Sequence, residues 1–481
     1  MNKHVIQLLS AAALLLPGLL SCSAGKSGTL ELNSEADLSG LTISCSSGNY
    51  YERKFSSRKD VTTFACNSEA DAIQAVRQGR ADVFVTDEVL VSEAAQKRLS
   101  LKLAMRGEDA FDVAFALQKG DSTLLRMFNG FIAGAPIDGI TAHWLKGGPE
   151  VPESPAAPDA GKPALRCIVC LNLEPVCFMG DGGRWLGLEP EIVERFARSI
   201  GRSVEFKYQD LGSAIMALET GQADIVSSSL FVTEERSKFV NFTIPYGKCH
   251  PAYFVKDNGG KAGPGLGGRI KMSLVTENRW KLITDGLAET LKITVLAILL
   301  GTVLGAGVCA AKRSRRKWLR DAAALYGAFI QGIPTLVLLL IMFYVIFAGS
   351  GVGGTAVAVI TFALCFASSS GSIFDTAISS VPKGQTEAGL SLGFTPFRTF
   401  TGIVLPQALK KGLPLYRGEC ISLLKSTSIV GYIAIQDLTR ASDLIRSRTF
   451  DALIPLLLVT AIYFLLAWLI RLSLNLLQPK K

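Results

Sequence analysis

The pattern of hydrophobic and polar positions divides the chain into two unlike halves. From Gly28 to about Leu145, and again from Leu165 to about Asp257, short apolar runs alternate with amphipathic stretches. This pattern is typical of strands and helices in a soluble α/β protein. It predicts strands at 41–43, 83–85, 113–117, 167–171 and 204–208, and helices at 70–78 and 189–200.

Beyond Gly286 the pattern becomes that of a membrane protein. Residues 293–311 and 452–470 are each uncharged for 19 residues, and residues 322–374 are uncharged for 53. At about 20 residues per span, these stretches are long enough for four membrane helices. A weaker segment at about 415–438 is interrupted by three charged residues, so hydropathy alone leaves it open. With it we expect about five spans, near 288–311, 323–348, 354–376, 415–438 and 452–474.

Linkers and an export signal flank these parts. Residues 147–164 are rich in Pro, Gly and Ala, and residues 258–280 begin with a glycine-rich run, as expected of tethers. Residues 1–21 place Lys3 before an apolar run and predict a signal peptide. This segment ends Leu19-Leu20-Ser21-Cys22, which resembles the lipobox at which bacterial lipoproteins are cut and acylated on the cysteine. Cleavage by ordinary signal peptidase, without acylation of Cys22, is the alternative.

Composition and charge fit this division. The chain has 481 residues, of which 49% are hydrophobic and 19% charged, which excludes disordered, collagen-like and small disulfide-rich proteins. Six of the nine residues 312–320 are basic and directly follow the first uncharged stretch. This is the positive-inside signature of a cytoplasmic loop, and no aromatic-interleaved basic motif indicates a nucleic-acid partner. In this topology Arg440, Arg446 and Arg448 fall in an outside loop, against the rule.

The segment 381–438 carries the most specific motif. It begins with an amphipathic helix, 383–392, which ends at Gly393. A short polar helix of this kind protrudes as a knob between spans and is suited to docking on a soluble partner. The residues Glu387, Ala388, Gly389, Gly393, Ile403, Leu405 and Pro406 match the EAA loop of bacterial ABC importer permeases, which enters a cleft on the ATPase subunit.

Residues 381–385 and 425–429 resemble the polar amino acid uptake branch of these permeases, the histidine/glutamine permease type. The resemblance spans 286–474 and implies five spans, a separate cytoplasmic ATPase and a second permease copy, either identical or a sister chain. It also implies a multi-pass protein of the bacterial inner membrane with a cytoplasmic C-terminus. Ser372 and Asp375 depart from the pattern, since the branch usually has Glu and Arg there.

The soluble half resembles type II solute-binding proteins for amino acids, which act outside the cell membrane. Residues 165–257 look like the first lobe and residues 28–146 like the second, an inverted order. Either the domain is circularly permuted, with 147–164 as the new connection, or two partial copies lie side by side. The expected fold class is therefore a two-lobed α/β domain like that of periplasmic binding proteins, followed by an all-α membrane domain, 281–481, of about five helices.

An amino-acid site needs a cation for the α-carboxylate and an anion for the α-ammonium, because a desolvated zwitterion is costly unless both charges are paired. Arg236 offers the bidentate fork that suits a carboxylate. By resemblance, Arg236 binds the carboxylate with Ser229 and Thr233 beside it, Asp87 binds the ammonium, and the loop at Gly48 and Asn49 offers backbone N–H groups. Alternatively, Arg236 lies on a solvated helix face and Asp87 merely caps a helix.

The sequence also excludes several functions. It contains no GxxxxGK[ST] motif, so we expect a transporter subunit and not an ATP-hydrolysing enzyme. Its three His are far apart, and Cys167 and Cys170 on one strand should point to opposite faces, so neither metal nor cofactor is expected. Six exported Cys allow disulfides without proving any. A ligand-gated channel or a solute sensor remains the alternative, although no selectivity-filter motif and no output domain is present.

Overall fold

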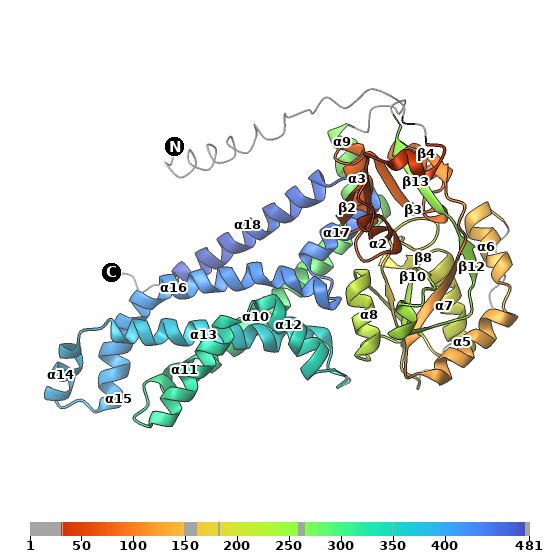
Figure 1. Cartoon of the computed structure of the whole chain (residues 1–481). Coiled ribbons are helices and arrows are strands. Elements are labelled where there is room, and N and C mark those ends of the chain that lie inside the picture. Colours follow the sequence, from red (N-terminus) through yellow and green to blue (C-terminus); the bar gives the residue numbers. More distant parts are fainter. Residues whose placement is uncertain are drawn as a thin grey trace.

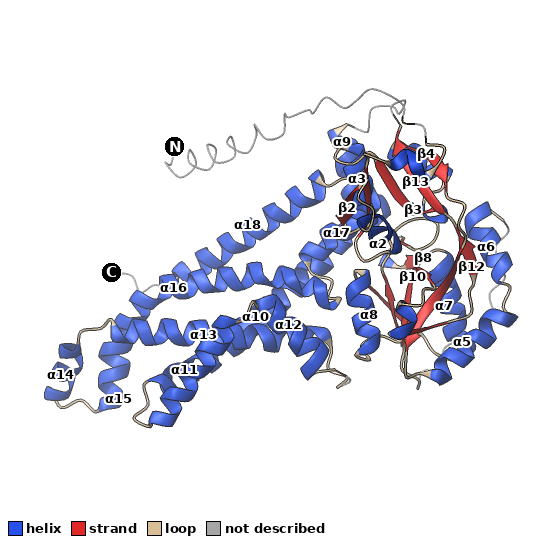
Figure 2. Ribbon diagram, viewed as in Figure 1, coloured by secondary structure: helices blue, strands red, loops and turns tan. Residues whose placement is uncertain are grey.

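The computed structural model describes residues 30, 32–148, 161–180, 183–257, 265–348 and 350–476. The predicted signal peptide, Cys22, residues 149–160 of the first linker and residues 258–264 of the second lie outside these residues. The described chain forms two parts, an α/β part on the right of Figure 1 and an all-helical part on the left. Figure 2 shows that all strands belong to the α/β part.

Lobe A of the α/β part is built on a five-stranded sheet with the order β2-β1-β3-β13-β4. Strands β1, β2 and β3 are parallel, and β13 runs antiparallel to both β3 and β4. Fully buried Val83 and Val85 place β3 at its centre, as their unbroken apolar run predicts. The elements are η2 (Glu35–Leu38), β1 (Thr42–Ser46), α2 (Tyr50–Ser56), β2 (Thr62–Cys66), α3 (Glu69–Arg77), β3 (Val83–Asp87), η3 (Glu88–Leu90), α4 (Glu93–Leu99), β4 (Leu101–Arg106) and β13 (Pro251–Lys256).

Lobe B contains the second large sheet, with the order β11-β5-β10-β6-β9 and β12 paired to β5. Its core is aromatic: Phe128 stacks on Phe196 with ring centroids 4.1 Å apart, and both are fully buried. The elements are β5 (Phe111–Gln118), α5 (Ser122–Gly134), α6 (Ile137–Lys146), β6 (Leu165–Val169), β7 (Phe178–Met179), β8 (Trp185–Leu186), α7 (Leu188–Ser199), β9 (Val204–Tyr208), α8 (Leu211–Glu219), β10 (Ile225–Phe231), η5 (Arg236–Lys238), β11 (Val240–Phe242) and β12 (Gly247–Cys249).

The sheets correct the predicted lobe boundaries. Residues 111–146 were expected in the same lobe as residues 28–110, but β5 pairs with β10, β11 and β12, so this stretch belongs to lobe B. Conversely, β13 belongs to lobe A. The chain therefore crosses between the lobes twice, between β4 and β5 and between β12 and β13. Each sheet therefore contains strands from both segments, and the two segments fold together as one two-lobed unit. Circular permutation stays a prediction.

The helical part contains three helices that are long and apolar enough to cross a membrane, counted over the described residues. They are α10 (Trp280–Lys312), α13 (Gly354–Ser379) and α18 (Leu453–Leu476). The pair α11 (Lys317–Gly332) and α12 (Thr335–Ile341), which the π-helical η8 (Met342–Ile346) continues, is bent by 102° and forms a fourth if it is one span. The remaining elements are α9 (Leu266–Ile270), η6 (Lys271–Val275), η7 (Thr276–Asn278), α14 (Lys383–Ser391), α15 (Pro396–Thr399), η9 (Phe400–Val404), α16 (Leu405–Ser426), η10 (Thr427–Ile433) and α17 (Leu438–Thr449).

The weak segment at 415–438 forms no separate helix. It is divided among α16, which begins ten residues earlier at Leu405, the 3-10 segment η10, and the start of α17. Helix α16 is not among the apolar spans, because its charged residues lower its hydropathy. One of these, Arg417, donates to the side chain of Asn475 on α18. The expectation of five spans therefore stays a prediction.

Helices α10 and α13 pack at close range through small residues. A Cβ atom added to Gly301 would lie 2.8 Å from the Ala363 carbonyl oxygen, and one added to Gly305 would overlap Ser370 Oγ. Glycines four residues apart allow such an approach because they place no side chain between the helices.

Candidate functional site

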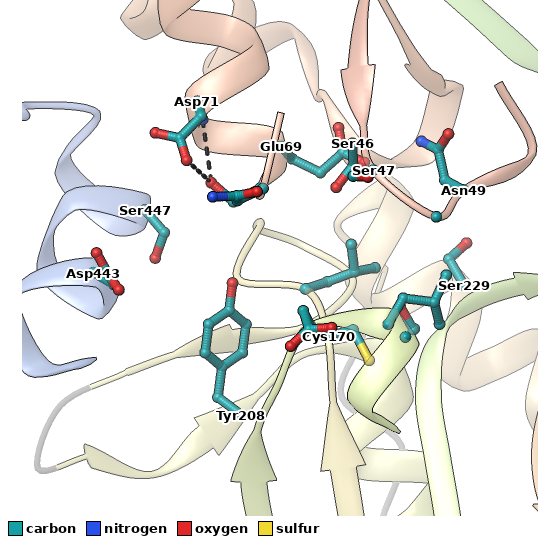
Figure 3. Close-up of a pocket in the computed structure, with 18 of the residues that line it drawn as sticks. Ser46, Ser47, Asn49, Glu69, Asp71, Cys170, Tyr208, Ser229, Asp443 and Ser447 are labelled. Atoms are coloured by element: carbon teal, nitrogen blue, oxygen red, sulfur yellow. Dashed lines mark hydrogen bonds between the residues drawn. The ribbon is translucent and has the colours of Figure 1, made fainter. Parts of the chain in front are cut away.

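A cavity of about 590 Å³ lies where the two lobes and the helical part meet. Figure 3 shows its three sides: Glu69 and Asn49 come from lobe A, Cys170 and Tyr208 from lobe B, and Asp443 and Ser447 from α17. The third side, here called the helical wall, consists of Ser428, Ile429, Gly431, Tyr432, Asp437, Thr439, Arg440, Asp443, Arg446 and Ser447. A cavity between two lobes is the expected place for a small ligand.

Arg236 lines this cavity from lobe B, as the sequence predicted for a ligand-binding cation. It lies at the first position of η5, in the turn that follows β10. Its guanidinium makes two long hydrogen bonds, 3.4 Å to the Phe231 carbonyl and 3.3 Å to the Gly48 carbonyl of lobe A. It takes part in no ion pair with the described residues. Burial, and after it the nearby charge of Arg53, lowers its pKa to about 10, which leaves the group charged at neutral pH.

Asp87 ends β3 and lines the cavity from lobe A. Its two carboxylate oxygens accept hydrogen bonds from Tyr51 Oη at 2.7 Å and from Ser229 Oγ of lobe B at 3.0 Å. Burial raises its pKa to about 6, against the effect of these two hydrogen bonds. Asp87 precedes η3 but makes no side-chain cap there. Arg236 and Asp87 therefore place a cation and an anion in the cavity, each without an oppositely charged partner within ion-pair distance in the described chain.

Ser229 occupies a strained backbone position. Its φ is +47°, and the pairing of β10 with β5 shifts register between Val226 and Leu230. Such a bulge re-aims a side chain and is common beside functional sites. Its N–H donates to Glu189 Oε1 at 2.7 Å, which fixes the turn and leaves its hydroxyl directed at Asp87.

The other predicted ligand residues have different tasks. Thr233 does not line the cavity, and its hydroxyl accepts from the Arg236 N–H at 3.3 Å, so it positions the arginine. Gly48 and Asn49 do line it. However, the Gly48 N–H already donates to Glu52 Oε2 at 2.5 Å, and the Asn49 side chain caps α2. The prediction that the Gly48 amide is free for a ligand is therefore wrong, because the acidic first turn of α2 occupies it.

An aromatic wall was missed by the sequence reasoning. Phe231 stacks on Phe111 with centroids 4.6 Å apart, and Tyr50 of lobe A packs 4.8 Å from Phe111. Tyr51 completes the group and orients Asp87. The adjacent tyrosines after Asn49 were the available signal. Phe231 thus stacks on Phe111 of its own lobe and packs edge-on against Tyr50 and Tyr51 of lobe A.

Two of the arginines that disagree with the positive-inside rule lie in the helical wall and contact the lobes. Arg446 pairs with Asp71 of lobe A at 3.2 Å. Arg440 donates to the Tyr208 carbonyl of lobe B at 3.1 Å and lies 4.5 Å over the Tyr208 ring. These side chains dock α17 on the α/β part.

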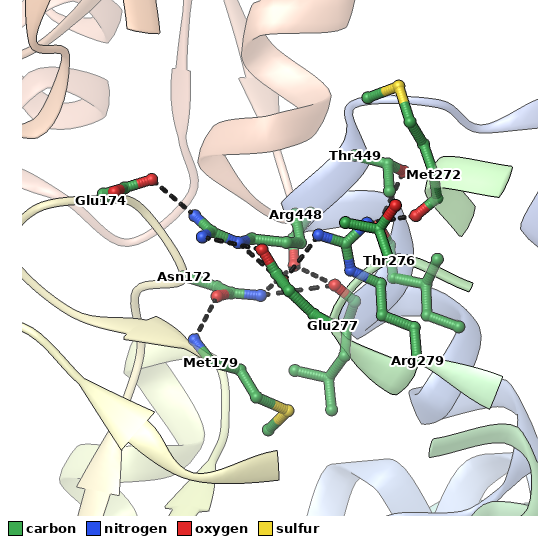
Figure 4. Close-up of polar contacts among 12 residues, drawn as sticks. Asn172, Glu174, Met179, Met272, Thr276, Glu277, Arg279, Arg448 and Thr449 are labelled. Carbon is green, nitrogen blue, oxygen red and sulfur yellow. Dashed lines mark hydrogen bonds and ion pairs between the residues drawn. The ribbon is translucent and has the colours of Figure 1, made fainter. Parts of the chain in front are cut away.

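Arg448 and Ser447 bind lobe B at a second point, shown in Figure 4. Arg448 pairs with Glu174 at 3.1 Å and with Glu277 at 3.3 Å. Ser447 Oγ accepts from Asn172 Nδ2 at 2.6 Å, and Asn172 Oδ1 in turn accepts from the Met179 N–H. Helix α17 therefore contacts both lobes at once. Both sets of contacts can form together only in one relative orientation of the two lobes.

We expect reversal of either charge of the Asp71–Arg446 pair to weaken docking. Both side chains are about one-quarter exposed, so each single reversal should cost roughly 1 kcal/mol, about a fivefold slower ligand uptake. Asp71→Arg combined with Arg446→Asp should recover most of the rate, as uptake into membrane vesicles would measure. Equal losses in the single and double variants would contradict direct pairing.

The predicted coupling segment forms a knob at the end of the helical part remote from the lobes, where Figure 1 shows α14 and α15. Glu387 and Ala388 are exposed on α14, whereas Gly389 is buried against Thr399 and Ile403. Gly393 has φ +81° and ends the helix as predicted. Leu405 and Pro406 begin α16, with the proline in its first turn, where its missing N–H costs nothing.

Ser372 and Asp375, the departures in the third predicted span, have local partners. Ser372 Oγ accepts from Lys312 Nζ at 2.8 Å, and Asp375 pairs with Arg313 at 2.9 Å. The basic run after α10 therefore lies beside the end of α13 that leads into α14.

The nine described cysteines carry free thiols. Cys167 is buried in the core of lobe B while Cys170 lines the cavity, so the two point to different faces as expected. No cluster of His, Cys, Asp and Glu that could hold a metal occurs in the described residues.

Comparison with known proteins decides the class. A family model described as the binding-protein-dependent transport system inner membrane component matches residues 297–481. The L-cystine transport system permease protein TcyB of Bacillus subtilis is 32% identical over 209 residues, 43% of this chain and 89% of that protein. The chain belongs to this family of transporter membrane components.

Further relatives agree with this membership. The putative glutamine transport system permease protein GlnP of Rickettsia felis is 29% identical over 203 residues, 41% of this chain and 92% of that protein. A solved structure described as an amino acid ABC transporter with histidines shares 33% identity over 41% of this chain and 93% of its own, with a TM-score of 0.38. The chain is thus a multi-pass inner-membrane permease subunit and not an enzyme. The predicted fold class, a two-lobed α/β domain before an all-α membrane domain, is confirmed.

Proposed function

We propose that this permease imports amino acids and that its own α/β half is the receptor that captures them. The cavity carries the proposal: it offers an unpaired guanidinium and an unpaired carboxylate to one ligand, and the permease itself forms its third side. An α-amino acid is the small solute that presents a carboxylate and an ammonium on one carbon. The relatives named for cystine and glutamine transport support the same class.

Each charge of the ligand has a partner on a different lobe. Arg236 of lobe B takes the carboxylate as a bidentate fork, which is stronger than a single neutral hydrogen bond. Asp87 of lobe A takes the ammonium, held by Tyr51. The ligand therefore connects the two lobes, and its binding favours their closed arrangement by its differential affinity for that state.

The closing motion of the lobes is transmitted to the membrane part by α17. This helix contacts both lobes and packs against α10 and α18. Opening of the lobes separates Asp71 from Glu174 and so breaks one of the two contacts of α17. The released helix then moves against α10, which opens the cavity toward the spans.

The orientation in the membrane follows from the two ends of the helical part. The lobes lie outside, and the α14–α15 knob with the adjacent basic residues Lys312 and Arg313 faces the cytoplasm. There the Glu387 helix binds a separate ATPase, since this sequence has no phosphate-binding loop. Five spans, a second permease copy, a cytoplasmic C-terminus and a lipid anchor at Cys22 complete the proposal.

Amino-acid binding should weaken in acid. With the pKa of Asp87 raised to about 6 in the empty site, the carboxylate is ionised at pH 7 and protonated below about pH 6. A bound ammonium lowers that pKa, so the contribution of Asp87 to affinity is full above about pH 6, and this contribution falls roughly tenfold per pH unit below it.

Calorimetric titration of the full chain in detergent with L-amino acids from pH 4 to 8 measures this profile. The N-acetyl and methyl-ester derivatives, each lacking one charge, serve as controls and should not bind. Equal binding of these derivatives, or no binding of any amino acid, would overturn the proposed function.

A further inference from the structure

Glu69 is a further carboxyl group in the same cavity that neither the α-carboxylate nor the α-ammonium of an amino acid uses. It begins α3 directly after the capping residue Ser68 and lines the cavity beside Ser46 and Ser47 (Figure 3). Its Oε2 atom is buried and accepts no hydrogen bond from the described residues. A buried carboxylate oxygen without a donor costs free energy unless a partner arrives.

The cavity as a whole is acidic. Six carboxylate side chains line it, Glu69, Asp71, Asp87, Asp210, Asp437 and Asp443, against three guanidinium groups. Several acids have assigned tasks: Asp71 pairs with Arg446, and Asp210 and Asp437 cap α8 and α17. After the ligand's own ammonium has taken Asp87, Glu69 remains without a cation. A site with such a balance attracts positively charged solutes.

Building on the proposed function, we propose that Glu69 binds a cationic group on the ligand's side chain, so that the imported amino acids are basic ones. Arg236, Asp87 and Glu69 then pair the three charges of such a ligand, one each. Tyr208, whose ring already stacks under Arg440, and Tyr50 offer aromatic faces beside the same space, suited to a cation and its aliphatic stem.

The protonation of Glu69 fits this assignment. Burial, and after it the charge of Asp87, raises its pKa to about 8. The groups that act on it or feel its charge are Thr86 and Asp87 of β3, Tyr51 of α2, Cys45 of β1 and Cys66 of β2, and a hydrogen bond with the Thr86 side chain lowers its pKa. The empty cavity therefore avoids two adjacent negative charges at neutral pH. A cationic side chain restores the ionised form, and its binding releases a proton.

Two ligand pairs of nearly equal shape test the inference. Arginine and citrulline differ in the charge of the side-chain head, as do lysine and norleucine. Calorimetric titration of the full chain should show at least about tenfold tighter binding of the charged member of each pair, because a desolvated carboxylate binds a cationic head more strongly than an uncharged one. Glu69→Gln should remove this preference and leave the affinity for citrulline unchanged.

Glu88→Gln is the matched control, because Glu88 follows Asp87 but pairs with Arg106 outside the cavity; it should keep the preference. Citrulline bound as tightly as arginine, or a preference that survives in Glu69→Gln, would overturn the inference while leaving the amino-acid receptor in place. Failure of every amino acid to bind would instead overturn the proposed function itself.

Discussion

Arg236→Ala abolishes detectable ligand capture by the full chain. Among the described residues, the guanidinium is the only cation that lines the cavity from either lobe, since Arg440 and Arg446 belong to the helical wall. Removing it leaves the ligand carboxylate desolvated without a partner, a loss of 2 to 5 kcal/mol or roughly 30-fold or more in affinity. Calorimetric titration measures this loss, and Arg236→Lys, which keeps the charge without the fork, should recover part of it.

Lys238→Ala is the control for this experiment, because Lys238 lies on the same short helix but is exposed. It should bind ligand as the unmodified chain does. Retained affinity in Arg236→Ala would place the carboxylate elsewhere in the cavity.

Gly389→Val uncouples transport from capture. A Cβ atom at Gly389 would lie 2.6 Å from Thr399 Cγ2 and 2.9 Å from Ile403 Cδ1, so any side chain pushes α14 away from α15 and η9. The displaced knob no longer fits the ATPase, and we expect uptake to fall at least about tenfold while ligand affinity stays the same. Uptake by vesicles from cells that produce the chain with its ATPase subunit measures the first, and calorimetry the second.

Gly384→Val is the matched variant on the same helix. A Cβ atom there meets nothing within 4 Å, so its effect reports helix propensity alone. If both variants transport at the same rate, the position of α14 does not govern coupling.

Motifs that act through local geometry were predictable. The stop at Gly393 needs only a positive φ, and the apolar lengths of α10, α13 and α18 need only about 20 uncharged residues each. Arg236 and Asp87 were predicted from residue type and from the resemblance to solute-binding proteins, and both line the cavity. For the helix stop and the apolar spans, the deciding property lies within the segment itself.

Partners distant in sequence were not predictable. Glu69 and Tyr50 gain their place in the cavity only because β1, β3 and α3 pack side by side, and Gly48 loses its free N–H to a glutamate of the next helix turn. The lobe boundaries were wrong for the same reason: hydropathy marks a strand but not the sheet that it joins, and β5 and β13 each joined the sheet of the other segment.

The sequence by itself determined the class of the protein: an α/β half, an apolar helical half and an EAA-like loop between spans. These depend on periodicity, span length and a short motif, which are local properties of the chain. Only the tertiary structure decided that both segments contribute strands to both sheets and that α17 docks on both lobes through Arg446 and Arg448. Those arginines conflict with a hydropathy reading because their partners, Asp71 and Glu174, are more than 270 residues away along the chain.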